Sequence, residues 1–87
     1  MSGSDGAPPL RSQQTLRACV SATLGEYLRE VDDSLVSELY TMVLNEVEPP
    51  LLEAVMQKAR SNQSVAARML GLNRGTLRKK LRQHGLL

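Results

Sequence analysis

Apolar side chains recur every three or four residues from Leu16 onward, which is the period of an amphipathic α-helix. Thr15 or Ser12 can cap the start of this helix, and Asp32 opens a polar break after it. The sequence therefore predicts a first helix from Leu16 to about Val31. Its apolar positions are Leu16, Val20, Leu24, Leu28 and Val31, with Cys19 and Tyr27 beside them, and Cys19 is expected to be a buried structural thiol.

A second apolar stripe follows, and Ser34 or Ser37 is expected to begin its helix. Pro49 and Pro50 interrupt it, and each removes a backbone donor and crowds the preceding turn. Two readings stay open at this point: one kinked helix, or two helices with Pro49 at the first position of the second. The stripe contains Leu35, Leu39, Met42, Val43, Val47, Leu51, Val55 and Ala59.

The C-terminal stretch reads as two short helices joined by a tight turn. Asn62 is a good N-cap for a helix over 63–70, and Gly71 tolerates the positive φ that a sharp turn requires. A second N-cap, Asn73, starts a helix that runs from Arg74 until Gly85 stops it. The inward-facing residues are expected to be Ala66, Ala67, Leu70, Leu77 and Leu81. This layout is typical of a helix-turn-helix, although an ordinary helical hairpin with a basic face would share it.

Charge is divided unevenly along the chain. All nine acidic residues lie before residue 54, whereas eight of the eleven basic residues lie from 54 onward, in a segment without any carboxylate. A solvated helix face usually mixes both signs, so this segregation indicates a polyanionic partner. Nucleic acid is the expected partner.

The remaining composition indicates one small helical domain. The chain has 87 residues and neither Trp nor Phe, so its core must be aliphatic and is expected to be shared between two chains. It contains no apolar run of the roughly 20 residues that a membrane span needs, and a cytoplasmic location is expected. His84 stands alone and is expected to touch backbone carbonyls or phosphate. No catalytic, metal-binding or cofactor-binding pattern is present, so no enzyme is expected.

The run EVEPPLLEAVMQKARSNQSVAARMLGLNRGTLRKKLRQHG, from Glu46 to Gly85, resembles the Fis (factor for inversion stimulation) family of bacterial nucleoid-associated proteins. Its most recognisable blocks are VExPLLxxVM and NRGTLRKKL, and the likeness continues back to about Leu16. The second block is also similar to the helix-turn-helix that ends many σ54-dependent activators. The resemblance implies an all-α fold of four helices, with a long, proline-kinked central helix in an intertwined dimer and a C-terminal helix-turn-helix.

The resemblance also implies roles for individual residues of this chain. Arg74 would hydrogen-bond guanine in the major groove, with Asn73 and Lys79 beside base edges or the adjacent phosphates. The DNA backbone would be held by Asn62, Ser64, Thr76, Arg78, Lys80 and Arg82. The dimer core would contain Leu39, Val43, Val47 and Leu51.

The expected organisation is a flexible tail over 1–15, a dimerisation core over 16–60 and a DNA-binding region over 61–87. The expected partners are double-stranded DNA, a second copy of the chain and RNA polymerase, in the nucleoid. No DNA invertase is expected, because Pro8, Pro9 and the shortage of apolar residues oppose a β-hairpin in the tail. The resemblance implies a homodimeric, nucleoid-associated regulator of transcription that binds and bends DNA. Two other functions stay open: a sequence-specific regulator of the kind that ends σ54-dependent activators, which does not bend DNA, and an oligomerisation module that binds an acidic protein surface.

Overall fold

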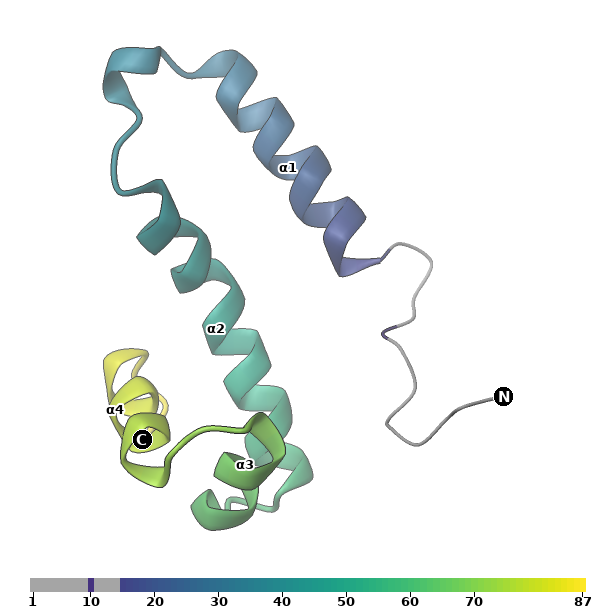
Figure 1. Cartoon of the computed structure of the whole chain (residues 1–87), viewed down its shortest axis with the longest axis vertical. Helices are drawn as coiled ribbons and strands as arrows, with labels where there is room; N and C mark the ends of the chain where they lie inside the picture. The colour runs from purple at the N-terminus through teal and green to yellow at the C-terminus, as the bar shows by residue number, and fades with distance from the viewer. Residues whose placement is uncertain (1–9, 11–14) are drawn as a thin grey trace. The chain divides into compact units, whose positions relative to one another are not determined.

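A computed structural model describes Leu10 and residues 15–87, and this part of the chain is entirely helical, with no strand (Figure 1). The expected tail over 1–15 and the alternative cap Ser12 fall outside it, apart from Leu10 and Thr15. The prediction of an all-α fold with four α-helices is confirmed. The elements in order are α1 (Leu16–Glu30), the short 3-10 helix η1 (Asp33–Leu35), α2 (Leu39–Lys58), α3 (Gln63–Leu70) and α4 (Arg74–Gln83).

The chain divides into two compact units, Met1–Ser37 and Glu38–Leu87. In the first unit, Thr15 caps α1 as predicted, because its Oγ1 accepts a hydrogen bond from the Ala18 backbone N–H at 3.1 Å. This cap satisfies one of the four backbone donors that the first turn of a helix leaves unpaired.

The predicted start of the second helix was wrong. Asp32 Oδ1 accepts hydrogen bonds from both the backbone N–H of Ser34 (2.9 Å) and its hydroxyl (2.8 Å), so Ser34 is held within η1. The helix begins only at Leu39, after Glu38, whose φ of 54° is left-handed and whose side chain makes no capping bond. Ser34 is therefore part of a local Asx-type turn and caps no α-helix. Ser37 does not begin the helix either, because Glu38 occupies the N-cap position.

The expected burial of Cys19 was also wrong, because the thiol is exposed and α1 has no buried residue. The first unit contains only α1 and the three-residue η1 among its described elements, so it holds no second α-helix on which α1 could pack. An amphipathic helix of this kind needs a partner to cover its apolar side. The apolar stripe of α1 is thus left without a core inside its own unit.

In the second unit, α2 runs without interruption through Pro49 and Pro50. Of the two readings of the prolines, the single helix is therefore correct, and the size of the kink stays a prediction. Prolines lack the N–H that would reach the carbonyls of Asn45 and Glu46 four residues earlier. The middle turn of α2 is consequently weaker in backbone hydrogen bonds than its two ends.

The core of the second unit lies where α2, α3 and α4 meet. Leu52 of α2 is 2 % exposed, and Leu77 and Leu81 of α4 are 0 % and 1 % exposed. The small side chains of Ala59, Ala66 and Ala67 complete the buried cluster and allow the three helices to approach closely. The predicted inward positions of the helix-turn-helix are thus confirmed, with Leu70 half-buried against this core.

The connection between α2 and α3 places Arg60 and Ser61 in the left-handed region, at φ of 53° and 65°. This conformation is unfavourable for residues with a Cβ. We expect Ser61→Gly to raise the free energy of unfolding by about 1 kcal/mol, since glycine adopts positive φ without a steric cost. Thermal denaturation followed by circular dichroism measures this. Ala54→Gly, in the regular part of α2, serves as the control and should lower stability by about 1 kcal/mol; a loss in both variants would contradict the strain at Ser61.

Candidate nucleic-acid interface

The first helix of the helix-turn-helix is fixed at both ends by local hydrogen bonds. Asn62 Oδ1 accepts from the Val65 backbone N–H at 3.1 Å and so caps α3. At the other end Gly71 has a φ of 75°, and the Leu72 N–H reaches back to the Ala67 carbonyl at 2.9 Å. This is a Schellman-type ending, which turns the chain sharply after the helix.

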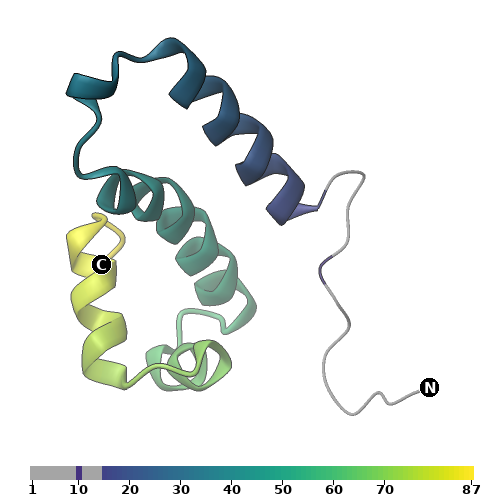
Figure 2. The same ribbon diagram turned by 45° about the horizontal axis from the view of Figure 1, so that its top comes forward.

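The second helix begins with an equally defined cap. Asn73 Oδ1 accepts from the Gly75 N–H at 2.7 Å, and Arg74 is the first residue of α4. Leu77 and Leu81, four residues apart, anchor one face of α4 in the core. Figure 2 shows α4, in yellow, returning beside α2 after the turn from α3. The opposite face of α4, which carries Arg74, Lys79 and Arg82, is exposed.

The structure brings most of the predicted DNA-contacting side chains to the exposed surface of α3 and α4. Arg74, Thr76, Arg78, Lys79 and Arg82 are all exposed on α4, which contains no carboxylate. Asn62 and Ser64 are exposed at the start of α3. Lys80 differs, because it is only partly exposed and faces α2.

Arg78 also makes a contact that the sequence did not reveal. Its Nη1 donates to Oε1 of Gln63 at 3.5 Å, so it connects α4 with the first residue of α3. The distance is long for a hydrogen bond, and the guanidinium keeps its other donors for a phosphate. Gln63 thus lies beside the candidate interface.

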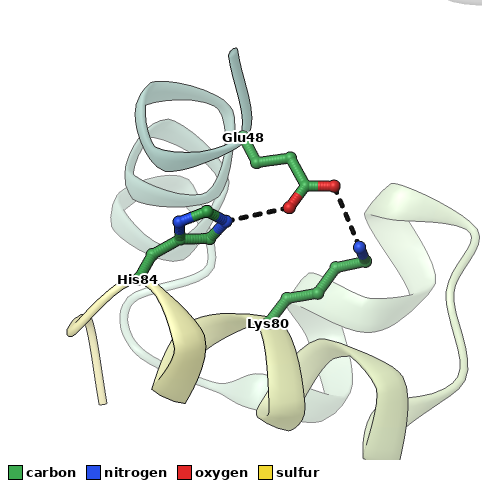
Figure 3. A network of polar contacts seen from close by, with 3 residues as sticks. All are labelled: Glu48, Lys80 and His84. Carbon is green, nitrogen blue, oxygen red and sulfur yellow. Dashed lines mark hydrogen bonds and ion pairs between the residues drawn. The ribbon is translucent and has the colours of Figure 1, made fainter. Parts of the chain in front are cut away.

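A polar cluster of three residues joins α4 to the middle of α2 (Figure 3). Glu48 Oε2 accepts from Lys80 Nζ and Glu48 Oε1 accepts from His84 Nε2, each at 2.9 Å. A carboxylate oxygen only accepts, so Nε2 carries the hydrogen in this contact. The side chains of Glu48 and His84 are 15 % and 7 % exposed, and that of Lys80 is 31 % exposed. We call these three residues the Glu48 cluster.

The Glu48 cluster corrects the prediction for His84. Its ring contacts a carboxylate of α2 instead of backbone carbonyls, through Nε2. The alternative contact of the ring with phosphate stays a prediction. Residues 48 and 84 are far apart along the chain, so helical periodicity could not pair them. The only local signal was the spacing of Lys80 and His84, which places them on one face of a helix.

The two hydrogen bonds of Glu48 favour its ionised form. The hydrogen bond from His84, followed by that from Lys80, lowers the pKa of the Glu48 carboxyl below its usual value of 4.5. A carboxyl with a lower pKa in the folded state stabilises the fold above the pKa of the unfolded chain. That stability is lost as the pH falls through the folded value.

We therefore expect the protein to lose thermal stability below about pH 4.5 more steeply than Glu48→Gln. At pH 7 the substitution itself should lower the free energy of unfolding by about 1.5–3 kcal/mol, the range for hydrogen bonds to charged groups. Denaturation midpoints between pH 3 and pH 7 test both expectations. Glu46→Gln is the matched control, because it makes the same substitution at an exposed position of the same helix, α2. Parallel pH profiles for the protein and Glu48→Gln would contradict the role of the cluster.

Two kinds of site are absent from the part of the chain that the structure describes. None of its helices is long and apolar enough to cross a membrane. Among the same residues, no group of three or more His, Cys, Asp or Glu side chains could hold a metal ion.

Comparison with known proteins agrees with this geometry. The model of a family described as "Bacterial regulatory protein, Fis family" matches residues 43–84, from the middle of the first half of α2 to the end of α4. A protein of Vibrio atlanticus named DNA-binding protein Fis is 53 % identical over 75 residues, which cover 86 % of this chain and 76 % of the relative. Proteins of the same name from Vibrio cholerae and Vibrio vulnificus are 52 % identical over the same shares. The resemblance seen in the two sequence blocks is thereby confirmed, and the chain belongs to the Fis family of bacterial regulatory proteins.

Proposed function

We propose that this protein is a homodimeric, DNA-binding and DNA-bending regulator of transcription. The main support for this proposal is the difference between the two faces of α4. Its inner face is anchored by two fully buried leucines, while its outer face carries exposed cations and no carboxylate. A helix of this kind, following a capped helix and a glycine turn, suits the major groove of DNA. The relatives named DNA-binding protein Fis support the same function.

We assign base contacts to Asn73, Arg74 and Lys79. Residues at the start of a recognition helix lie closest to the base edges, and Arg74 is the first residue of α4. Arginine offers the two parallel donors that match O6 and N7 of guanine. The amide oxygen of Asn73 is used by the cap, so its NH₂ group is the part left for DNA.

Contacts with the DNA backbone are assigned to a larger group that positions the protein without reading sequence. The starts of α3 and α4 favour phosphate through their free N–H groups and helix dipoles. The group consists of Asn62, Ser64, Thr76, Arg78, Lys80 and Arg82.

We further propose that residues 16–60 form the dimer and residues 61–87 bind DNA. Leu39, Val43 and Val47 are only half-buried within one chain, and Leu51 and Met42 are 47 % and 39 % exposed. An apolar stripe of this length on a helix requires a partner. A second copy would supply it and would place two recognition helices against the same face of the DNA, which bending requires.

The location and further partners follow from this function. A DNA-binding regulator of a bacterium acts in the nucleoid, within the cytoplasm, and RNA polymerase is a candidate partner. We propose no catalytic activity, and no activation of a DNA invertase. The tail on which the invertase argument rests lies mostly outside the described residues.

A titration of random-sequence duplex DNA tests the central proposal. We expect binding at low salt that weakens steeply as salt rises, because each phosphate contact releases about 0.9 counterion in B-DNA. A circular-permutation assay on one bound fragment then tests bending, since mobility should depend on the position of the site. Binding without such dependence would favour a sequence-specific regulator that leaves DNA straight. No binding at low salt would favour an acidic protein partner.

A further inference from the structure

The Glu48 cluster places a carboxylate within 2.9 Å of a lysine that belongs to the candidate interface. By charge alone, such a carboxylate should weaken the binding of a polyanion, because it neutralises a cation and repels phosphates. The geometry suggests the opposite effect. Glu48 is held from two sides, and it is the only acidic partner of α4 in the described residues.

The position of Glu48 is fixed before any ligand arrives. Its Oε1 is bound by His84, whose ring is almost fully buried. Along the chain it is followed at once by Pro49 and Pro50, which hold φ at two successive positions. The carboxylate is thus held by His84 at the end of α4, and it gives the Lys80 ammonium a fixed anchor.

Lys80 keeps the capacity to bind a second anion while it is anchored. An ammonium has three donors, and Glu48 Oε2 uses one of them. The side chain is still 31 % exposed. A free lysine side chain loses much rotamer freedom when it is immobilised, whereas here that loss occurs on folding and not on binding.

We propose that Glu48 is a positioning residue for DNA binding: it orients Lys80 so that the ammonium bridges the carboxylate and a DNA phosphate. The proposal rests on the DNA-binding function argued above. It assigns a favourable role in binding DNA to an acidic residue of α2, outside the helix-turn-helix.

The test compares affinities for one duplex at several salt concentrations in the full-length protein, Glu48→Gln, Lys80→Met and the double variant. We expect Glu48→Gln to bind DNA about three- to tenfold more weakly. Without its anchor, Lys80 would lose part of its side-chain rotamer entropy on binding instead of on folding. The same change in the Lys80→Met background should alter affinity by less than about twofold, because a positioning residue acts through the group it positions. Lys80→Met should lower the salt slope by about 0.9.

Glu46→Gln is the matched control, since it removes the same charge from an exposed position of α2. Charge removal alone should leave its affinity unchanged or slightly higher. Glu48→Gln binding at least as tightly as the unaltered protein would overturn the inference, and so would an equal loss in both backgrounds.

If Glu48→Gln does not fold, the salt slope of Lys80→Met decides, because an unchanged slope means that Lys80 touches no phosphate. An unaltered protein that fails to bind DNA would overturn the proposed function together with this inference. If the unaltered protein binds DNA and Glu48→Gln binds at least as tightly, only the inference is overturned.

Discussion

Val43→Glu is expected to abolish both the dimer and the folded state. Within one chain Val43 is only half-buried on α2, so the carboxylate of a glutamate there would still reach water. In a shared core the same carboxylate would be buried without a partner, which is among the most unfavourable changes a core can undergo. We expect a loss of more than about 4 kcal/mol, comparable with the whole stability of a small domain.

The size of this effect follows from how little of the chain is covered by its own core. Among the residues that the structure describes, six are buried, all of them in the second unit, and α1 contributes none. A core of this size stabilises a domain only marginally. Folding and association are therefore expected to be coupled, and stability should rise with protein concentration.

Analytical ultracentrifugation and circular dichroism at micromolar concentration provide the measurement. Asn45→Glu is the control, because Asn45 is exposed on the same helix and receives the same charge. It should remain a folded dimer. A folded monomer in either the unaltered protein or Val43→Glu would refute the shared core, and would also remove the basis for DNA bending by two recognition helices.

The helix-turn-helix was predictable because its boundaries depend on short-range chemistry. The caps at Asn62 and Asn73 bond backbone donors two or three residues away. Gly71 adopts the positive φ that its turn requires. Leu77 and Leu81 follow from helical periodicity alone. Each of these features involves interactions within a few residues, which a single sequence records directly.

Other features were not predictable, because they depend on a choice between alternative local hydrogen bonds or on contacts between residues far apart in the sequence. Ser34 had two possible local roles, and the nearby Asp32 decided between them. Local rules supported one helix through Pro49 and Pro50 and two separate helices equally well. Only the family resemblance favoured the single helix that α2 forms. The Glu48 cluster joins residues 32 and 36 positions apart, and no periodic pattern relates such positions. Burial of Cys19 was inferred from the apolar face of α1, which has no covering partner in its own unit.

Arg74→Ala is expected to remove most of the preference for a particular DNA sequence. Arg74 is exposed at the first position of α4, where it is placed to donate two parallel hydrogen bonds to a guanine. Loss of one such pair lowers discrimination by about 1–3 kcal/mol, or roughly five- to 150-fold. Binding to random DNA should fall much less, because it depends on the phosphate contacts of the other cations.

Arg82→Ala supplies the matched comparison, because it removes the same side chain from the exposed surface of the same helix. Arg82 lies near the end of α4 and is assigned to a phosphate, so its loss should weaken preferred and random duplexes by the same factor. Dissociation constants for one preferred and one random duplex, at a single salt concentration, separate the two roles. If Arg74→Ala also weakened both duplexes equally, Arg74 would touch only phosphate, and sequence preference would have to come from Asn73, Lys79 or the shape of the DNA.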